Sequence, residues 1–431
     1  MQSRRHLFFI ALAIGLMVPG VVLRIGGGHV ADPLAALLFG VAIVGAAFLL
    51  SWAAEVAQLD ISAGLAIAVL AFIAVLPEYA IDLVFAIKGG HSYKAHHFAS
   101  CPAPIKGDES PCSLALANMT GANRLLIGVG WSLVIFLAWR QYNKRGDKES
   151  GKEVKLDRSH AVELSYLAVA TAYSLFIALR RSITIVDAVL LVGLFVAYTI
   201  RISKAPAEEP DLVGPAAWLG ALGVAKRRTV VLVFFIGAAG VILLCAEHFA
   251  EALVATGAHL GVSEFLLVQW LAPLASEAPE LLVAGMFAWR LNTNAGLGTL
   301  VSSKVNQWTL LVGTLPLAFA AASGSRHGLP IDAFQREELF LTAAQSAFAV
   351  AVLSNLSMST REAMQMFGLF AAQFIVGAVG PESIHGQVRV GTAIIYLLLA
   401  AREFYLQRDA IRPMLRDGFR TSYEDLQTDV V

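Results

Sequence analysis

The chain has 431 residues, of which 57% are hydrophobic and only 15% are charged, and its mean hydropathy is +0.67. A soluble domain has about 25% charged residues, so the composition argues against a soluble enzyme, a nucleic-acid binder or a disordered scaffold. The 32 basic and 32 acidic residues cancel, so no polyanionic partner is indicated. The chain is predicted to be an all-α polytopic membrane protein.

Twelve apolar stretches are expected to cross the membrane, because a spanning helix needs about 20 mostly apolar residues. Barrel strands are shorter and alternate in polarity, so helices are expected. Arg4 and Arg5 precede the first span, which is predicted to be a signal anchor because no small-residue cleavage site follows it. The last span is short and could lie at the membrane surface. The expected spans are residues 7–23, 33–54, 61–77, 113–139, 161–179, 182–200, 229–246, 265–289, 305–325, 339–360, 363–381 and 388–401.

Basic residues predict the orientation, because cytoplasmic loops are enriched in lysine and arginine. Segment 140–158 contains seven of them, segment 201–228 contains five, and the tail after Ala401 contains five. With twelve spans, all three segments and both termini lie in the cytoplasm, and the protein is expected in the cell membrane. The loop that contains Cys101 and Cys112 then lies outside, where a disulfide could form and contribute roughly 3 kcal/mol.

Two stretches of the chain repeat each other. Both begin with Leu-x-[Ile/Val]-Ser, at Leu59 and Leu260, and both continue through an apolar helix to Pro-Glu, which ends at Glu78 and Glu280. Each is followed by a span with early polar residues. Glu78 lies in the third span and Glu280 in the eighth, and five spans apart is an odd number, so the copies cross the membrane in opposite directions. This predicts an inverted 5+5 repeat with one extra helix at each end, which is typical of secondary transporters.

The repeat divides the chain into five expected segments. They are an N-terminal signal-anchor helix at 1–32, a first repeat half at 33–202 with its motif region at 59–130, a cytoplasmic linker at 203–228, a second repeat half at 229–380 with its motif region at 260–313, and a last helix with a cytoplasmic tail at 381–431.

The Pro-Glu pairs suggest a cation site. Proline removes a backbone donor and breaks or kinks the helix, which frees carbonyl oxygens, and the glutamate adds negative charge. Such oxygens suit hard cations such as calcium or sodium, and a carboxylate in hydrocarbon normally marks an ion or proton path. Glu78 and Glu280 are therefore predicted to bind the ion at the membrane midplane. The alternative for Glu280 is a structural pair with Lys304.

Further polar residues of the same spans are candidates for the site. Asp82 lies one turn after Glu78, and a partner in the site, a proton carrier and an ion pair with Arg124 remain open. Glu277 lies three residues before Glu280, and two carboxylates so close would suit proton coupling. Polar residues in spans also tie helices together without touching a substrate. The candidate neutral oxygen ligands are Ser276, Ser303, Asn306, Gln307, Thr120 and Asn123.

These motifs resemble those of the cation/calcium exchanger superfamily over residues 37–377. Members carry Gly-Thr-Ser-x-Pro-Glu on one helix of each inverted repeat and Gly-Ser-Asn-x-x-Asn on the next. Here the first pattern reads IAVLPE at 73–78 and ASEAPE at 275–280, and the second reads MTGANR at 119–124 and SSKVNQ at 302–307. The resemblance implies cation exchange at a midplane site between the repeats.

Lys304 stands where the superfamily usually has Asn, Asp or a small hydroxyl residue, and a mid-membrane lysine is costly unless it is paired. Its ammonium either fills one cation position permanently, as a tethered surrogate that makes binding depend more on pH, or only locks two helices together. Lys304 and Arg124 are the residues expected to tune the charge of the site.

The sequence therefore predicts a secondary active cation antiporter, not an enzyme, that exchanges calcium for another cation and is driven by a sodium or proton gradient. One alternative is a sodium/proton or other cation/proton antiporter on the same fold. Another is a non-transporting membrane scaffold or sensor with a degenerate exchanger core. The expected partners are the lipid bilayer and inorganic cations, with no cofactor and no nucleic acid, and the oligomeric state does not follow from the sequence.

Overall fold

The computed structural model describes residues 2–60, 76–102, 109–147, 152–205, 212–260 and 263–427. Within these ranges eleven helices are long and apolar enough to cross a membrane, and the expected span at 61–77 lies almost wholly outside them. The helices are α1 (Gln2–Gly26), α2 (Asp32–Ala57), α4 (Leu76–Ala95), α5 (Pro111–Leu125), η1 (Leu126–Trp131), α6 (Ser132–Lys144), η3 (Arg158–His160), α7 (Ala161–Ile177), α8 (Ile185–Ile202), α9 (Pro215–Gly220), α10 (Val224–Leu260), α11 (Glu264–Trp289), α12 (Thr293–Asn306), η4 (Gln307–Leu311), α13 (Val312–Ser323), α14 (Ala333–Val352), η5 (Leu353–Asn355), α15 (Thr360–Val379), α16 (Glu382–Leu406), α17 (Arg408–Phe419) and α18 (Tyr423–Gln427). The short strands are β1 (Glu153–Lys155), β2 (Ser182–Ile183), β3 (Leu329–Pro330) and β4 (Ser357–Ser359).

The chain forms two compact units. The first unit comprises Met1–Met119, Ala205–Glu280 and Ala318–Ser325, and the second comprises Thr120–Lys204, Leu281–Leu317 and Arg326–Val431. Two spans contain a π-helical turn, η1 between α5 and α6 and η4 between α12 and α13. These two turns follow Asn123 and Asn306, so the irregular turns occupy matching places in the two repeats.

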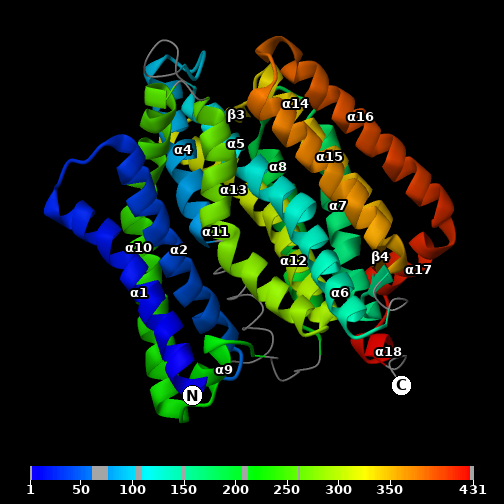
Figure 1. The fold of residues 1–431 in the computed structure, drawn as a ribbon. Coiled ribbons are helices and arrows are strands. Elements are labelled where there is room, and N and C mark those ends of the chain that lie inside the picture. The colour runs from blue at the N-terminus through cyan, green and yellow to red at the C-terminus, as the bar shows by residue number, and fades with distance from the viewer. Residues whose placement is uncertain are drawn as a thin grey trace. The chain divides into compact units, whose positions relative to one another are not determined.

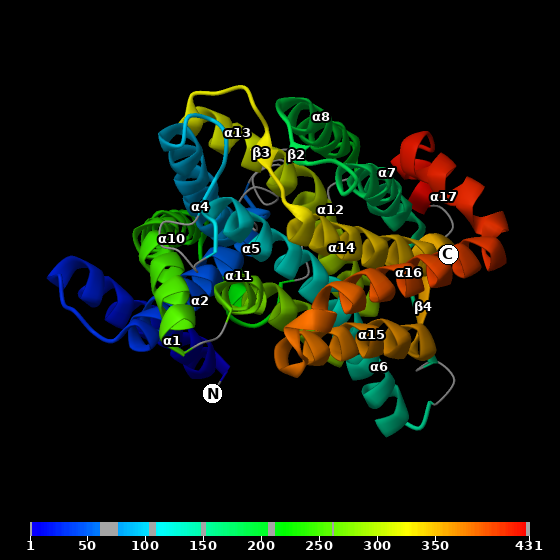
Figure 2. The ribbon, with the colours of Figure 1, turned by 90° about the horizontal axis from the view of Figure 1, so that it is seen from above.

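In the first unit, α1, α2 and α10 pack side by side (Figure 1), and the view from above agrees (Figure 2). Small residues permit this approach. A Cβ added at Gly45 of α2 would lie 2.4 Å from the carbonyl oxygen of Ala13, and one added at Gly40 would lie 2.9 Å from the ring of Phe249 on α10. Close packing of helix backbones through small residues is the usual way in which helices associate in a bilayer.

In the second unit, two short strand pairs reveal the relation between the repeats. β1 pairs antiparallel with β4, and β2 pairs antiparallel with β3. Since α7 runs from β1 to β2 and α14 runs from β3 to β4, these two contacting helices are antiparallel. The corresponding helices α8 and α15 also begin with capping boxes of the same kind, Thr184 with Asp187 and Ser359 with Glu362. The inverted repeat predicted from the sequence is confirmed.

Two glycines let helices approach the π-helical spans. A Cβ at Gly128 in η1 would lie 2.4 Å from the ring of Phe370 on α15, and one at Gly313, after η4, would lie 3.0 Å from Val192 on α8. The last helix of each repeat half thus packs against the irregular span of the opposite half.

The C-terminal part is more ordered than the sequence indicated. The last span, expected to be short, is the 25-residue helix α16, and the tail continues as α17 and α18. In Figure 1, α14, α15 and α16 lie side by side, and Figure 2 agrees. Helix α17 packs against α7, and Arg158 donates to the Asp417 carboxylate over 2.6 and 3.1 Å.

Candidate cation-binding site

The Pro-Glu motif of the first repeat opens helix α4. Pro77 is buried in the described part of this helix, and Glu78 is 1% exposed. Asp82 follows four residues later on the same face and is completely buried. The residues that precede Leu76, which include 73–75 of the motif, lie outside the described ranges. Helix α4 therefore contributes two buried carboxylates to the first unit.

The motif of the second repeat lies inside helix α11. Ser276 and Glu277 are 3% and 1% exposed, and Glu280 is partly exposed. The helix contains Pro273 and Pro279 and runs without interruption from Glu264 to Trp289, so of the break or kink predicted at the Pro-Glu pair, the break does not occur in this copy. The Ser276 hydroxyl donates to the carbonyl oxygens of Ala272 and Pro273, both at 3.3 Å, which keeps it in the proline-modified turn.

The first unit brings the two motifs together. The Glu78 carboxyl group lies beside the side chains of Glu277 and Ser276, and its charged neighbours include Glu280 and Asp82. Two carboxyl groups can hydrogen-bond to each other only when one of them carries a proton. A hydrogen bond between Glu78 and Glu277, one acid from each repeat, would therefore require a proton on one of them.

Several oxygens in this group accept no hydrogen bond from the described part of the chain. They are Oε2 of Glu78, Oδ2 of Asp82 and Oδ1 of Asn118. The other oxygen of Asp82 accepts from the Asn118 amide at 2.7 Å. Among the described residues, no three acidic, histidine or cysteine side chains are close enough to hold a metal by themselves. A cation here would need neutral oxygens as well as carboxylates, as calcium and sodium sites commonly do.

The remaining predicted ligands lie in the second unit. All are at most 5% exposed: Thr120 and Asn123 on α5, Ser303 and Asn306 on α12, and Gln307 on η4. Within this unit the fully buried Lys304 reaches Asn123, to which its ammonium donates twice, at 2.9 Å to the backbone oxygen and at 2.6 Å to Oδ1. Ser302 meets the hydroxyl of Tyr198 at 2.8 Å. Lys304 and Asn123 thus connect the two repeats at this point.

The second charge-tuning candidate, Arg124, is held by partners that the sequence did not indicate. It donates to the Glu338 carboxylate at 2.7 Å and to Gln373, and its backbone oxygen accepts from Gln345. Glu338 stands one residue before a charge-free run and was therefore placed in a loop. The helix in fact starts earlier, at Ala333, which carries Glu338 into the buried part of the unit.

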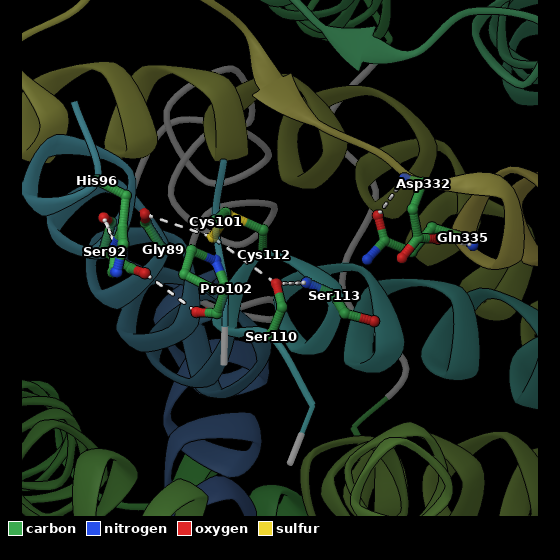
Figure 3. Close-up of a disulfide and its surroundings, with 10 residues drawn as sticks. All are labelled: Gly89, Ser92, His96, Cys101, Pro102, Ser110, Cys112, Ser113, Asp332 and Gln335. Atoms are coloured by element: carbon green, nitrogen blue, oxygen red, sulfur yellow. Dashed lines mark hydrogen bonds between the residues drawn. A yellow bond between two sulfur atoms is a disulfide. The ribbon is translucent and has the colours of Figure 1, made fainter. Parts of the chain in front are cut away.

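The sulfurs of Cys101 and Cys112 are bonded in a disulfide (Figure 3). Cys112 is 2% exposed and lies in the first turn of α5, while a Cβ added at Gly89 of α4 would lie 2.8 Å from its sulfur. Ser92 of α4 donates to the Pro102 carbonyl oxygen at 3.1 Å. The disulfide therefore links the segment after α4, which carries Glu78, to the first turn of α5, which carries Asn118.

Asn118 is the site residue that sequence reasoning missed. It is completely buried and holds Asp82. It lies five residues before Asn123, outside the six-residue motif pattern. The sequence did contain a sign of this role, because an asparagine inside an apolar span is costly unless it has a partner.

Comparisons with known proteins identify the family. The model of the sodium/calcium exchanger protein family matches residues 33–204 and 230–399. The solved structure titled H+/Ca2+ exchanger CAX is 38% identical, with 99% of this chain and 100% of that chain covered and a TM-score of 0.85. Two structures of YfkE, a Ca2+/H+ antiporter, are each 14% identical, cover 91% of this chain and 99% of theirs, and have TM-scores of 0.57 and 0.53, which shows a similar fold. A search of curated protein sequences returns no match. The chain belongs to the sodium/calcium exchanger family, as the repeat motifs predicted.

Proposed function

We propose that this protein is a secondary antiporter that exchanges calcium for protons across a membrane. The observation that carries the proposal is that the carboxyl groups of Glu78 and Glu277, one from each repeat, lie beside each other, where they could hydrogen-bond only with a proton on one of them. A divalent cation bound to the same oxygens would displace that proton, because it prefers ionised carboxylates. Binding of one ion and release of the other are then coupled at one place.

Neighbouring groups support this assignment. Glu280 and Asp82 add negative charge beside the Glu78–Glu277 pair, and Ser276 adds a neutral oxygen. Asp82 lies one helical turn after Glu78, and Asn118 on α5 donates to it. Each of these two residues has an oxygen that accepts no hydrogen bond from the described residues. The 38% identical relative is described as an H+/Ca2+ exchanger, which agrees with protons rather than sodium as the coupling ion.

Purified protein in proteoliposomes tests the proposal. Vesicles that are acidic inside should take up calcium and become more alkaline inside, whereas a sodium gradient in place of the proton gradient should drive no uptake. Sodium-driven calcium uptake would change the coupling ion, and sodium flux coupled to protons without calcium flux would favour the sodium/proton alternative. No flux of any of these ions would leave the non-transporting scaffold as the better description.

We also propose a cell-membrane orientation with both termini in the cytoplasm, residues 1–32 as a signal anchor and residues 203–228 as the linker between the halves 33–202 and 229–380. The β1–β4 and β2–β3 pairs support it, because each pair joins two loops that the predicted orientation puts on one side. Single cysteines labelled by an impermeant reagent test it. Labelling of segment 140–158 from outside intact cells would overturn the orientation.

A further inference from the structure

Lys304 occupies an environment that resembles a site for a monovalent cation. Its ammonium is completely buried, contacts two oxygens of Asn123 at 2.9 and 2.6 Å, and lies 5.0 Å from the centre of the Trp308 ring. Carbonyl oxygens and an aromatic face are the groups that stabilise a desolvated single positive charge. The surroundings of the ammonium are therefore suited to a charge of this size and sign.

The repeat gives a direct comparison for this environment. Asn123 and Asn306 are counterparts: Asn123 lies two residues before the end of α5, Asn306 is the last residue of α12, and a π-helical turn follows each helix. Two residues before Asn306 stands Lys304, and two residues before Asn123 stands Gly121. The side-chain oxygen of Asn123 accepts from the lysine, whereas Oδ1 of Asn306, although buried, accepts no hydrogen bond from the described residues. Lys304 and Gly121 are thus a position at which the two repeats differ in charge.

We propose that the Lys304 ammonium is a permanently bound internal cation, which fills the position at Asn123 and leaves only its counterpart at Asn306 open to a mobile ion. The proposal rests on the proposed function in treating this part of the repeats as a cation path. Lys304 would then set how many ions the protein binds, so it is a residue that determines specificity. A lysine that only locks two helices would leave that number unchanged.

Lys304→Gly tests the proposal, because it gives the second repeat the residue that the first has at the same place. The expected result is one additional monovalent ion bound per folded protein, counted with radiolabelled sodium and rubidium on detergent-solubilised, monodisperse protein. The variant should also melt at a higher temperature in sodium or potassium chloride than in N-methylglucamine chloride of equal strength, by a wider margin than the wild type does.

Two control variants separate the charge from the space that it fills. Lys304→Met removes the charge but keeps the bulk, so it should bind no additional ion. Lys144→Met removes an exposed lysine that also lies 5.0 Å from a tryptophan ring, that of Trp289, and should behave as the wild type. A folded Lys304→Gly protein that binds the same number of ions as the wild type would contradict the proposal.

The outcome stays decisive if the variant folds poorly. A Lys304→Gly or Lys304→Ala protein that aggregates in N-methylglucamine chloride but is recovered by sodium or potassium would support the internal cation, and aggregation of both variants in every salt would contradict it. The ion count does not require calcium transport. A wild type without calcium flux would therefore overturn the proposed function alone, and an unchanged count would overturn only this inference.

Discussion

Two buried polar groups, one in each unit, differ in how their charges are matched. In the second unit, Arg124 meets Glu338 at 2.7 Å and Gln373 beside it. In the first unit, Glu78 faces Glu277 from the other repeat, with Glu280 and Asp82 nearby, so its charged neighbours are acids. Arg124, Glu338, Glu78, Glu277 and Asp82 are all buried, whereas Glu280 is partly exposed.

The difference separates structure from function. Removing an ion pair from water is roughly offset when the charges match, so the arginine group can serve the fold alone. Acids gathered without a matching cation are costly, and such an arrangement persists where a mobile ion or proton completes it.

The largest effect is expected when a site carboxylate loses its charge. Glu78→Gln and Glu280→Gln should each abolish calcium binding, because the amide keeps the shape but supplies no negative charge. The proteins should stay folded, since acid–acid repulsion is relieved. The measurement is the rise in melting temperature with calcium. At a hundredfold excess over Kd, calcium should add about 2.7 kcal/mol to the stability of the wild type and nearly nothing to that of the variants.

Glu264→Gln is the matched control for these variants. Glu264 lies on the same helix as Glu280 and is 6% exposed, and its carboxylate accepts the Glu109 backbone N–H at 3.0 Å. It should keep the calcium response of the wild type. A full calcium response in either site variant would place the ion elsewhere.

The next effect concerns the matched pair. Arg124→Met should destabilise the protein by about 3–5 kcal/mol, because it leaves a buried carboxylate without its main partner. Arg389 lies 3.7 Å from Glu338 and compensates only in part. The double variant Arg124→Met/Glu338→Leu should regain most of that stability and should still bind calcium. Thermal unfolding in detergent measures the stability of both variants. A double variant that stays folded but loses calcium binding would assign Arg124 to the ion path.

Asp82 should show an intermediate effect, because one of its oxygens is held by Asn118 and the other is open. Asp82→Asn is expected to weaken calcium binding by about 10–100-fold, or roughly 1.4 kcal/mol for each factor of ten. Asn118→Ala keeps the charge and should change affinity less. Equal affinities of Asp82→Asn and wild-type protein, from equilibrium binding of radiolabelled calcium, would reduce Asp82 to a structural role.

The smallest effect is expected at the tail. Burial acts to raise the pKa of Asp417, but hydrogen bonds from Arg158 and Thr421 outweigh it, so the pKa lies below its usual value. A lowered pKa stabilises the folded protein above the ordinary pKa of about 3.9, and this contribution disappears as the pH falls through the lower folded value. Asp417→Asn should cost about 1 kcal/mol at neutral pH and less in acid. An equal loss of stability at both pH values would exclude the charge as its source.

The sequence was sufficient for eleven of the twelve expected spans, for the repeat and for bringing Glu78 and Glu280 together, because apolar length and a recurring motif are local signals. It did not indicate the partners. Arg124 pairs with Glu338 from 214 positions away, and Lys304 reaches Asn123 from 181 positions away. Such choices depend on which helices pack together, which no local pattern records. The π-helical turns were missed for a similar reason, since they change the hydrogen-bond register of a span without changing its apolar composition.

Simultaneous calcium and proton fluxes in proteoliposomes test the central claim most directly, with wild-type, Glu78→Gln and Glu264→Gln proteins reconstituted at equal amounts. The account predicts calcium uptake coupled to proton release from acid-loaded vesicles for the wild type and Glu264→Gln, and neither flux for a folded Glu78→Gln protein. Coupled fluxes of wild-type size in Glu78→Gln would contradict the claim that the shared proton between the repeats is exchanged for calcium.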